Sequence, residues 1–279
     1  MDLAKVKKIA IIGVGLMGGS LALALKKKFP KLTVWGFARS QASYRKLKRL
    51  GFLDKVETDL AKLVSDSELI VFGLPVEAIS VYLKKISPFL KKGTVIFDLG
   101  STKSLIQSQA KKVLPSETVF VGCHPLAGSE KSGAEHSLST LYAGSICFIT
   151  SAKSKTTRTV KSLWESLGCR VIFIDPNSHD RILSAISHLP HLLSFSLADF
   201  VPKNYLEFAT PSFKDLTRIA NSPASVWADI FLANRKNILK DLEKYLKLLK
   251  QYREKLKHSD KTAIIKLIDK ANLKQKRVR

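Results

Sequence analysis

The chain has 279 residues, which is enough for one large domain or for two domains of ordinary size. Hydrophobic residues make up 45% of it, and no apolar run approaches the roughly 18 residues that a membrane-spanning helix needs. The three cysteines form no CxxC pair, and the N-terminus lacks the apolar core of a signal peptide. We therefore expect a soluble, cytoplasmic protein.

The formal net charge of +24 is the most extreme property of the composition. A field of this strength attracts nucleic acids and anionic membranes. However, the lysines are scattered along the chain, and no motif that reads nucleic acid accompanies them. We therefore expect no nucleic-acid partner and no membrane partner, and we expect the charge to help anionic substrates approach.

The first motif is a glycine-rich turn close to the N-terminus. An apolar run at 9–12 predicts a strand, and the residues at 21–25 continue with helical spacing. Between them stand three glycines at the G-x-G-x-x-G spacing, which in this context favours a dinucleotide site over a turn without a ligand. The N-terminus of the following helix would face the phosphates. The residues expected to contact the cofactor here are Gly13, Gly15, Leu16, Met17 and Gly18.

The end of the second predicted strand, at 32–37, indicates which cofactor is used. In a dinucleotide fold an acidic residue at this point binds the ribose of NAD, whereas an arginine with small polar neighbours accommodates the 2′-phosphate of NADP. This chain has Arg39 and Ser40 there and no acid in reach. The sequence therefore favours NADP, with NAD as the alternative if Arg39 only faces solvent at the start of a helix over 41–50.

Strands and helices continue to alternate up to about residue 175. Such alternation predicts a doubly wound, mostly parallel sheet, and we expect an α/β Rossmann domain over residues 1–175. The predicted strands are 69–72, 94–97, 118–121, 145–149 and 170–174, with helices at 76–90 and 155–167.

Beyond Asp175 and Pro176 the apolar spacing becomes helical and strand patterns disappear. We expect an all-α domain over residues 176–279. Its apolar faces are too long for about a hundred residues to cover, which predicts a homodimer formed through this domain. The predicted helices are 182–200, 213–220, 225–248 and 261–271.

Two polar clusters follow predicted strands, where ligands bind in open α/β sheets. His124 could accept a proton from a substrate hydroxyl while the neighbouring carbon gives up hydride. Ser101 could hold the same hydroxyl or orient the imidazole. The structural alternatives are a helix N-cap for Ser101 and a purely structural role for His124.

Two further histidines, His188 and His191, lie three residues apart on one predicted helix face. No carboxylate or thiol stands near them at a familiar zinc spacing, so we predict no metal site. Hydrogen bonding to an acidic substrate fits them better. The alternative is a proline-kinked helix whose histidines only bridge to the other domain.

An acidic and a basic residue, Asp215 and Arg218, follow in the helical half. Ser212 and Asp215 have the spacing of a capping box, and Asp215 lies one turn before Arg218. Asp215 would hold the Arg218 guanidinium so that it presents a fork to a carboxylate. The alternative is a surface ion pair. Trp227 could line the same cleft, but it is expected in the helical core.

Taken together, these motifs resemble the prephenate dehydrogenase family, also called cyclohexadienyl dehydrogenases. The resemblance spans roughly residues 8 to 230. It is carried by the glycine turn at 13–20, Gly-Ser-Thr-Lys at 100–103, His-Pro-Leu-Ala-Gly-Ser-Glu-Lys-Ser-Gly at 124–133, His-Leu-Pro-His at 188–191 and Asp-Leu-Thr-Arg at 215–218. It implies a Rossmann domain, a helical dimerisation domain, and oxidative decarboxylation of prephenate to 4-hydroxyphenylpyruvate in tyrosine biosynthesis.

The resemblance also implies roles for individual residues. His124 would accept the hydrogen bond of the ring hydroxyl with Ser101 beside it, and Arg218 would bind the side-chain carboxylate. The remaining substrate-binding residues that it implies are His188, His191, Glu130 and Asp215, of which Glu130 and Asp215 would gate the pocket and position the arginine.

The chain departs from the family pattern just before the arginine, where Thr210-Pro211-Ser212 replaces the usual glycines. This leaves substrate range and tyrosine feedback open. Arogenate dehydrogenase is the alternative within the family. A different β-hydroxyacid dehydrogenase would need a lysine base in the helical half, and a regulator that binds nucleotide or nucleic acid without turnover is the alternative outside enzymes.

Overall fold

The main sheet positions the predicted cofactor turn. In the computed structural model, which describes residues 6–129 and 131–278, this sheet has six parallel strands in the order β3-β2-β1-β4-β5-β6. The order reverses direction between β1 and β4, which is where an open α/β sheet forms a ligand crevice. The strands are β1 (Lys8–Ile12), β2 (Thr33–Phe37), β3 (Lys55–Glu57), β4 (Leu69–Phe72), β5 (Val95–Asp98) and β6 (Val119–Val121).

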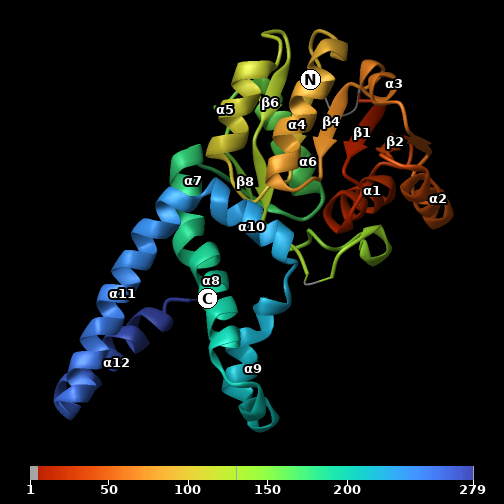
Figure 1. The fold of residues 1–279 in the computed structure, drawn as a ribbon. Coiled ribbons are helices and arrows are strands. Elements are labelled where there is room, and N and C mark those ends of the chain that lie inside the picture. The colour runs from red at the N-terminus through yellow and green to blue at the C-terminus, as the bar shows by residue number, and fades with distance from the viewer. Residues whose placement is uncertain (1–5, 130, 279) are drawn as a thin grey trace.

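Helices cover both faces of this sheet, so its central strands are apolar on both sides (Figure 1). Alternate residues of β1 face opposite ways: Ile9 and Ile11 join one core, and Ala10 and Ile12 join the other. The first core is closed by α1 (Leu16–Lys28) and α6 (Lys155–Ser166), and the second by α3 (Leu60–Ser65), α4 (Val76–Ile86) and α5 (Ser104–Val113); α2 (Gln41–Leu50) follows β2. The predicted Rossmann fold is confirmed.

A second, three-stranded sheet carries His124. The two strands expected near 145–149 and 170–174 form as β8 (Ile146–Ile149) and β9 (Arg170–Phe173), but they belong to this separate sheet. Their partner is β7 (Cys123–Pro125), which pairs antiparallel with β8 and which the sequence pattern did not reveal. His124 is therefore held in a strand, opposite Phe148, and not in a loop.

After β9, all regular elements in the described part of the chain are helices or helical turns (Figure 1). Two arms extend from the sheet, one formed by α8 and α9 and the other by α11 and α12. None of the helices in the described ranges is long and apolar enough to cross a membrane. The helices are α7 (Pro176–Leu183), α8 (Leu189–Phe200), α9 (Pro211–Thr217), α10 (Ala224–Ala233), α11 (Arg235–Lys257) and α12 (Lys261–Gln275).

Two of the predicted helices are interrupted. The stretch expected as one helix over 182–200 contains a π-helical turn, Ser184–His188, between α7 and α8. This turn ends just before Pro190, whose ring would crowd a carbonyl one turn back in a regular α-helix. The stretch expected as one helix over 225–248 breaks at Asn234, between α10 and α11.

Replacing Gly13 should destabilise the fold, because its backbone has a positive φ and also approaches another backbone segment closely. Its φ is +97°, and a Cβ added to it would lie 2.6 Å from the backbone of Gly73. Gly51 has a similar φ of +69°, but nothing lies within 4 Å of its added Cβ. Gly51→Ala should cost about 1 kcal/mol of the free energy of unfolding, and Gly13→Ala about 3 kcal/mol or more. Urea denaturation of both variants measures the difference, and equal losses would show that the Gly13–Gly73 approach is not tight.

Candidate active site

A cleft of about 950 Å³ lies between the carboxyl ends of the strands and the helical part. Both halves of the molecule contribute side chains to it. From the sheet side it is lined by Gly15, Leu16, Met17, Ser101 and His124, and from the helical side by His188, His191, Arg218 and Trp227. The structure thus brings together most of the residues that the motifs predict.

The glycine turn leaves space at one end of the cleft. α1 begins directly after Gly15 and has no side-chain cap, so its first N–H groups are available to an anion. A Cβ added to Gly15 would have no atom within 4 Å, whereas one added to Gly18 would collide with the carbonyl oxygen of Gly13. The backbone is therefore closely packed at Gly18, while Gly15 leaves open space on the side of the cleft. Such space fits the pyrophosphate of a dinucleotide.

Arg39 and Ser40 lie at the end of β2, outside the residues that line the cleft. Both are exposed. Ser40 caps α2, because its hydroxyl accepts the N–H of Ser43 at 3.2 Å and its own N–H donates to the Ser43 hydroxyl. Arg39 makes no ion pair within the described part of the chain, so its guanidinium is available to an added phosphate.

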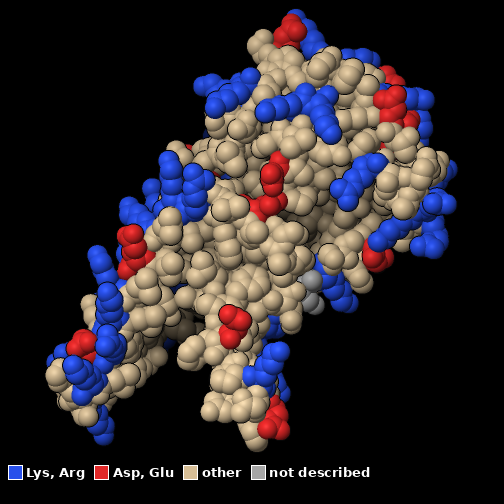
Figure 2. Space-filling view, in the orientation of Figure 1, with Lys and Arg blue, Asp and Glu red and all other residues tan. Residues whose placement is uncertain are grey.

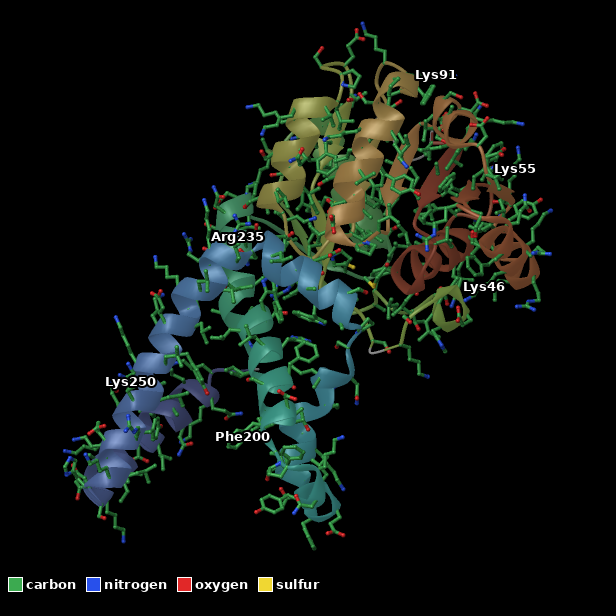
Figure 3. The ribbon with its side chains drawn as sticks, viewed as in Figure 1. Lys46, Lys55, Lys91, Phe200, Arg235 and Lys250 are labelled. Atoms are coloured by element: carbon green, nitrogen blue, oxygen red, sulfur yellow. The ribbon has the colours of Figure 1, made fainter. Side chains whose placement is uncertain are left out.

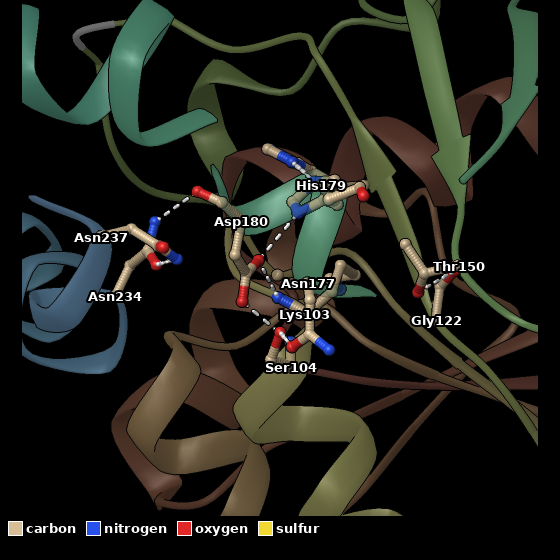
Figure 4. Close-up of polar contacts among 12 residues, drawn as sticks. Lys103, Ser104, Gly122, Thr150, Asn177, His179, Asp180, Asn234 and Asn237 are labelled. Atoms are coloured by element: carbon tan, nitrogen blue, oxygen red, sulfur yellow. Dashed lines mark hydrogen bonds and ion pairs between the residues drawn. The ribbon is translucent and has the colours of Figure 1, made fainter. Parts of the chain in front are cut away.

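His124 ends a chain of three side chains. Its Nδ1 lies 2.9 Å from Nε2 of His179, and Nδ1 of His179 lies 2.8 Å from the Asp180 carboxylate. All three are buried. His179 and Asp180 come from α7, so the helical part reaches back to the strand that holds His124 (Figure 4).

The Asp180 carboxylate is fixed by α5 as well as by His179. It accepts the N–H of Lys103 at 2.8 Å and the N–H of Ser104 at 2.9 Å, so it caps the N-terminus of α5 from another helix (Figure 4). Burial acts to raise the pKa of Asp180, but the hydrogen bonds from His179 and from these two N–H groups outweigh it, and the pKa is lowered. Asp180 is therefore an anion.

An anionic Asp180 determines where the protons of the two histidines lie. Nδ1–H of His179 donates to Asp180, so in neutral His179 the Nε2 atom is an acceptor. That acceptor takes the Nδ1–H of His124, which leaves Nε2 of His124 with a lone pair and no partner among the described residues. Burial, and then the nearby His179 and Lys103, lower the pKa of His124 well below 6.5. His124 is a neutral base that lines the cleft.

A buried ion pair fixes the strand that carries His124. The ammonium of Lys103 pairs with Asp98 at the end of β5 and also donates to the carbonyl of Cys123 at 2.7 Å. The other Asp98 oxygen accepts the N–H of Cys123 at 3.1 Å. Burial raises the pKa of Asp98 even though Lys103 opposes it. β7 is thereby attached to β5 immediately before His124.

Ser101 lines the cleft between these groups and is partly buried. The helix-cap alternative for it is wrong, because α5 begins at Ser104 and its capping oxygens come from Asp180. Its hydroxyl is therefore free of a capping role.

The helical side of the cleft presents a stacked aromatic pair. His191 stacks on Trp227 with 3.5 Å between ring centroids and 19° between the ring planes. Trp227 lines the cleft and packs against the core that α3, α4 and α5 close, not against a separate helical core. Nδ1–H of His191 donates to the carbonyl of Ser187 at 2.9 Å, and burial lowers the pKa of His191. In the neutral form its Nε2 is therefore a hydrogen-bond acceptor.

Arg218 reaches the cleft, but Asp215 does not hold it. Within the described residues the two form no ion pair, so the expectation that Asp215 holds the Arg218 guanidinium is wrong. Asp215 is exposed in the last turn of α9, and Arg218 begins a 3-10 turn, Arg218–Asn221. The predicted capping by Ser212 is also wrong, since the hydroxyl of Thr210 accepts the N–H of Phe213 at 3.3 Å.

Two further predictions are the role of Glu130 and the absence of a metal site. Glu130 lies outside the described residues. In residues 6–129 and 131–278, no three His, Cys, Asp or Glu side chains are grouped so that they could hold a metal ion.

The residues that sequence reasoning missed are those that act on other side chains, above all His179 and Asp180. They stand one turn after Asp175, which caps α7 through the N–H of Ser178. The sequence shows a His-Asp pair near the start of a helix. It does not show what the pair contacts, because α7 meets α5 and β7 only in the folded chain.

A dinucleotide-binding turn that shares one cleft with a neutral histidine base and an arginine defines a nicotinamide-dependent oxidoreductase of small anionic substrates. Comparison with known proteins agrees with this class. The family descriptions that match are "Prephenate dehydrogenase, nucleotide-binding domain" over residues 21–173 and "Prephenate dehydrogenase, dimerization domain" over residues 175–270.

Individual relatives match over most of their length. The chain is 33% identical to a prephenate dehydrogenase of Lactococcus lactis, over 92% of this chain and 73% of the relative. It is 31% identical to a cyclohexadienyl dehydrogenase of Zymomonas mobilis, over 91% and 90% of the two chains. A crystal structure of the Aquifex aeolicus prephenate dehydrogenase with hydroxyphenyl propionate and NAD+ superposes with a TM-score of 0.88 at 32% identity, over 99% of each chain.

The chain belongs to the prephenate dehydrogenase family, whose members are nicotinamide-dependent oxidoreductases. The family predicted from the motifs is confirmed.

Proposed function

We propose that the chain oxidises and decarboxylates prephenate to 4-hydroxyphenylpyruvate, with His124 as the base and Ser101 beside it. The observation that carries this proposal is the ordered contact of His124, His179 and Asp180, which leaves a neutral imidazole facing the cleft. The same cleft has the cofactor turn at one end and Arg218 on its helical side.

The base works through its free nitrogen. Nε2 of His124 accepts the proton of the ring hydroxyl, and the positive charge that develops on the imidazole is shared with His179 and with the Asp180 anion. The nicotinamide, when bound, supplies the acceptor for the hydride of the ring carbon. As the hydride leaves, the bond to the ring carboxylate breaks, its electron pair enters the ring, and carbon dioxide departs, which makes the ring aromatic. The protonated His124 then returns its proton to the phenolate oxygen, which gives 4-hydroxyphenylpyruvate.

The helical side of the cleft binds the rest of the substrate. The Arg218 guanidinium pairs with the side-chain carboxylate, because its planar fork matches that group. His191 and His188 contact the substrate from the same side, and the resemblance adds Glu130 and Asp215 to this set. The surrounding positive charge steers a dianion toward the cleft; Figure 2 shows Lys and Arg spread over this face of the molecule.

NADP is the cofactor that the end of β2 favours. Arg39 is exposed and unpaired in the described structure, and no acid occupies the position of Ala38 where a ribose-binding carboxylate would stand. Glu57 lies at the end of the neighbouring strand β3. Its carboxylate already pairs with the Lys55 ammonium at 3.0 Å and accepts the N–H groups of Thr58 and Asp59, so these contacts compete with binding of a ribose.

The helical residues 176–279 serve as a dimerisation domain in this proposal, joined to a Rossmann domain over 1–175. The arms expose large apolar side chains that one copy cannot cover, and Phe200 near the far end of α8 is the most exposed (Figure 3). Exposed fractions on the arms are 81% for Phe200, 74% for Phe208, 65% for Leu256 and 63% for Leu216. A second copy of the chain would bury these faces.

His124→Asn tests the proposed function. Purified protein with prephenate should form reduced nicotinamide, and this variant should lower kcat by roughly a hundredfold or more, because Asn accepts no proton from the hydroxyl. The affinity for the cofactor should not change. His258→Asn, on an exposed residue of the arm, is the matched control and should keep full turnover. Turnover with arogenate but not prephenate would move the assignment within the family, and no turnover with either would refute it.

Arg39→Ala tests the cofactor choice. Loss of a charged hydrogen bond to the 2′-phosphate should raise the KM for NADP about tenfold and leave the KM for NAD nearly unchanged. Steady-state kinetics with each cofactor measures both values. Arg49→Ala, exposed at the far end of α2, controls for the loss of surface charge. Equal effects of Arg39→Ala on the two cofactors would mean that Arg39 only faces solvent.

A further inference from the structure

Asn234 interrupts the predicted long helix and lies buried between α10 and α11. Its side chain contacts residues of three different segments. The amide Nδ2 lies 2.7 Å from the carbonyl oxygen of Asp180, and Oδ1 lies 2.7 Å from Nδ2 of Asn237 (Figure 4). The same Nδ2 also lies 3.0 Å from Nδ1 of His188.

The orientation of this amide follows from its neighbours. The Asp180 carbonyl can only accept, so the atom facing it must be the NH₂ group. The opposite atom then has to be the oxygen, which accepts from the Asn237 amide. Both hydrogens of Nδ2 are thereby used, one toward Asp180 and one toward His188.

This orientation determines the proton position on His188. Because Asn234 donates to Nδ1, that atom carries the lone pair, and in the neutral ring the hydrogen lies on Nε2. Burial lowers the pKa of His188 to about 4; Asp180 acts to raise it, while His179 and His191 lower it further, and His124 lies near enough to interact. His188 is therefore a neutral Nε2–H donor at neutral pH.

The Nε2 atom of His188 is buried and has no hydrogen-bond partner among the described residues. His188 belongs to the lining of the cleft, and its ring meets Trp227 edge-on at 6.2 Å between centroids. A buried donor without a partner is costly, since its desolvation is not compensated. A ligand oxygen in the cleft would compensate it.

We propose that Asn234 is a positioning residue that holds His188 as an Nε2–H donor for a carboxylate or keto oxygen of the substrate. The assignment rests on the proposed function, and it gives the two neighbouring histidines opposite roles. Neutral His191 presents an acceptor because it donates to Ser187, whereas His188 presents a donor because it accepts from Asn234. Asn234 also binds the carbonyl of Asp180, so the same amide supports the residue that orders His124.

The proton position can be read on the wild-type protein without substrate. In a ¹⁵N NMR spectrum of the histidine-labelled chain, Nδ1 of His188 should have the shift of an unprotonated ring nitrogen and Nε2 that of a protonated one. The signals that vanish in His188→Gln assign the residue. A proton on Nδ1, or two protonated nitrogens at pH 7, would overturn the proposal, and this readout does not depend on which substrate the enzyme uses.

Asn234→Asp tests the consequence for binding. A carboxylate at this position accepts from Nδ1–H of His188 and raises the pKa of His188. In the variant, His188 keeps its Nε2–H at low pH as a cation and loses it as pH rises through the new pKa. The ratio of the prephenate KM at pH 9 to that at pH 6 should therefore exceed the wild-type ratio about tenfold.

Asn272→Asp, an exposed change of the same kind on α12, is the matched control and should keep the wild-type ratio. A purely structural role for Asn234 would lower the stability or kcat of Asn234→Asp without changing how KM depends on pH, and that result would contradict the proposal. If the wild-type protein turns over neither prephenate nor arogenate, the proposed function fails, while the NMR result still decides the proton position.

Discussion

The carboxylate of Asp180 joins the two parts of the molecule and orders the proposed base. It accepts two backbone N–H groups at the start of α5, and it accepts from His179, which in turn contacts His124. A helix N-terminus favours an anion, so α5 keeps Asp180 ionised in a buried position where burial alone would favour its neutral form. The buried pair of Lys103 and Asp98 then fixes β7, so that His124 meets this chain of contacts at a fixed distance.

The histidines of the cleft differ in function because their backbone and amide partners differ. His124 offers a lone pair because its Nδ1–H is used by His179, and neutral His191 offers one because it donates to Ser187. His188 offers a hydrogen because Asn234 donates to it. Burial lowers the pKa of all three, so these roles are set by proton position and not by charge. Positive charge at the cleft then comes from Arg218 and from the lysine-rich surface.

Sequence reasoning succeeded where the information is local. The glycine turn, the alternation of strands and helices, and the polar residues after strands depend on short-range patterns. These patterns predicted the Rossmann fold and placed His124 and Ser101 at the carboxyl ends of strands, and the family resemblance added Arg218 to the same site. It failed where a tertiary contact decides. Asp180 caps a helix whose first residues lie 77 positions away in the chain, and Asn234 breaks a continuous apolar pattern to reach His188. Neither of these contacts leaves a periodic signal.

The proposed chemistry requires that His124 is neutral in the free enzyme, and burial beside His179 and Lys103 keeps it so. The pH dependence of kcat/KM for prephenate shows whether it is, because this profile reports the pKa values of the essential acid and base groups of the free enzyme. His124 can accept a proton only when it is unprotonated, and its lowered pKa keeps it unprotonated to well below pH 6.5. We expect kcat/KM to stay level as the pH falls to 6.5 and to decline only at lower pH. A decline with its midpoint at or above pH 6.5 would contradict this expectation.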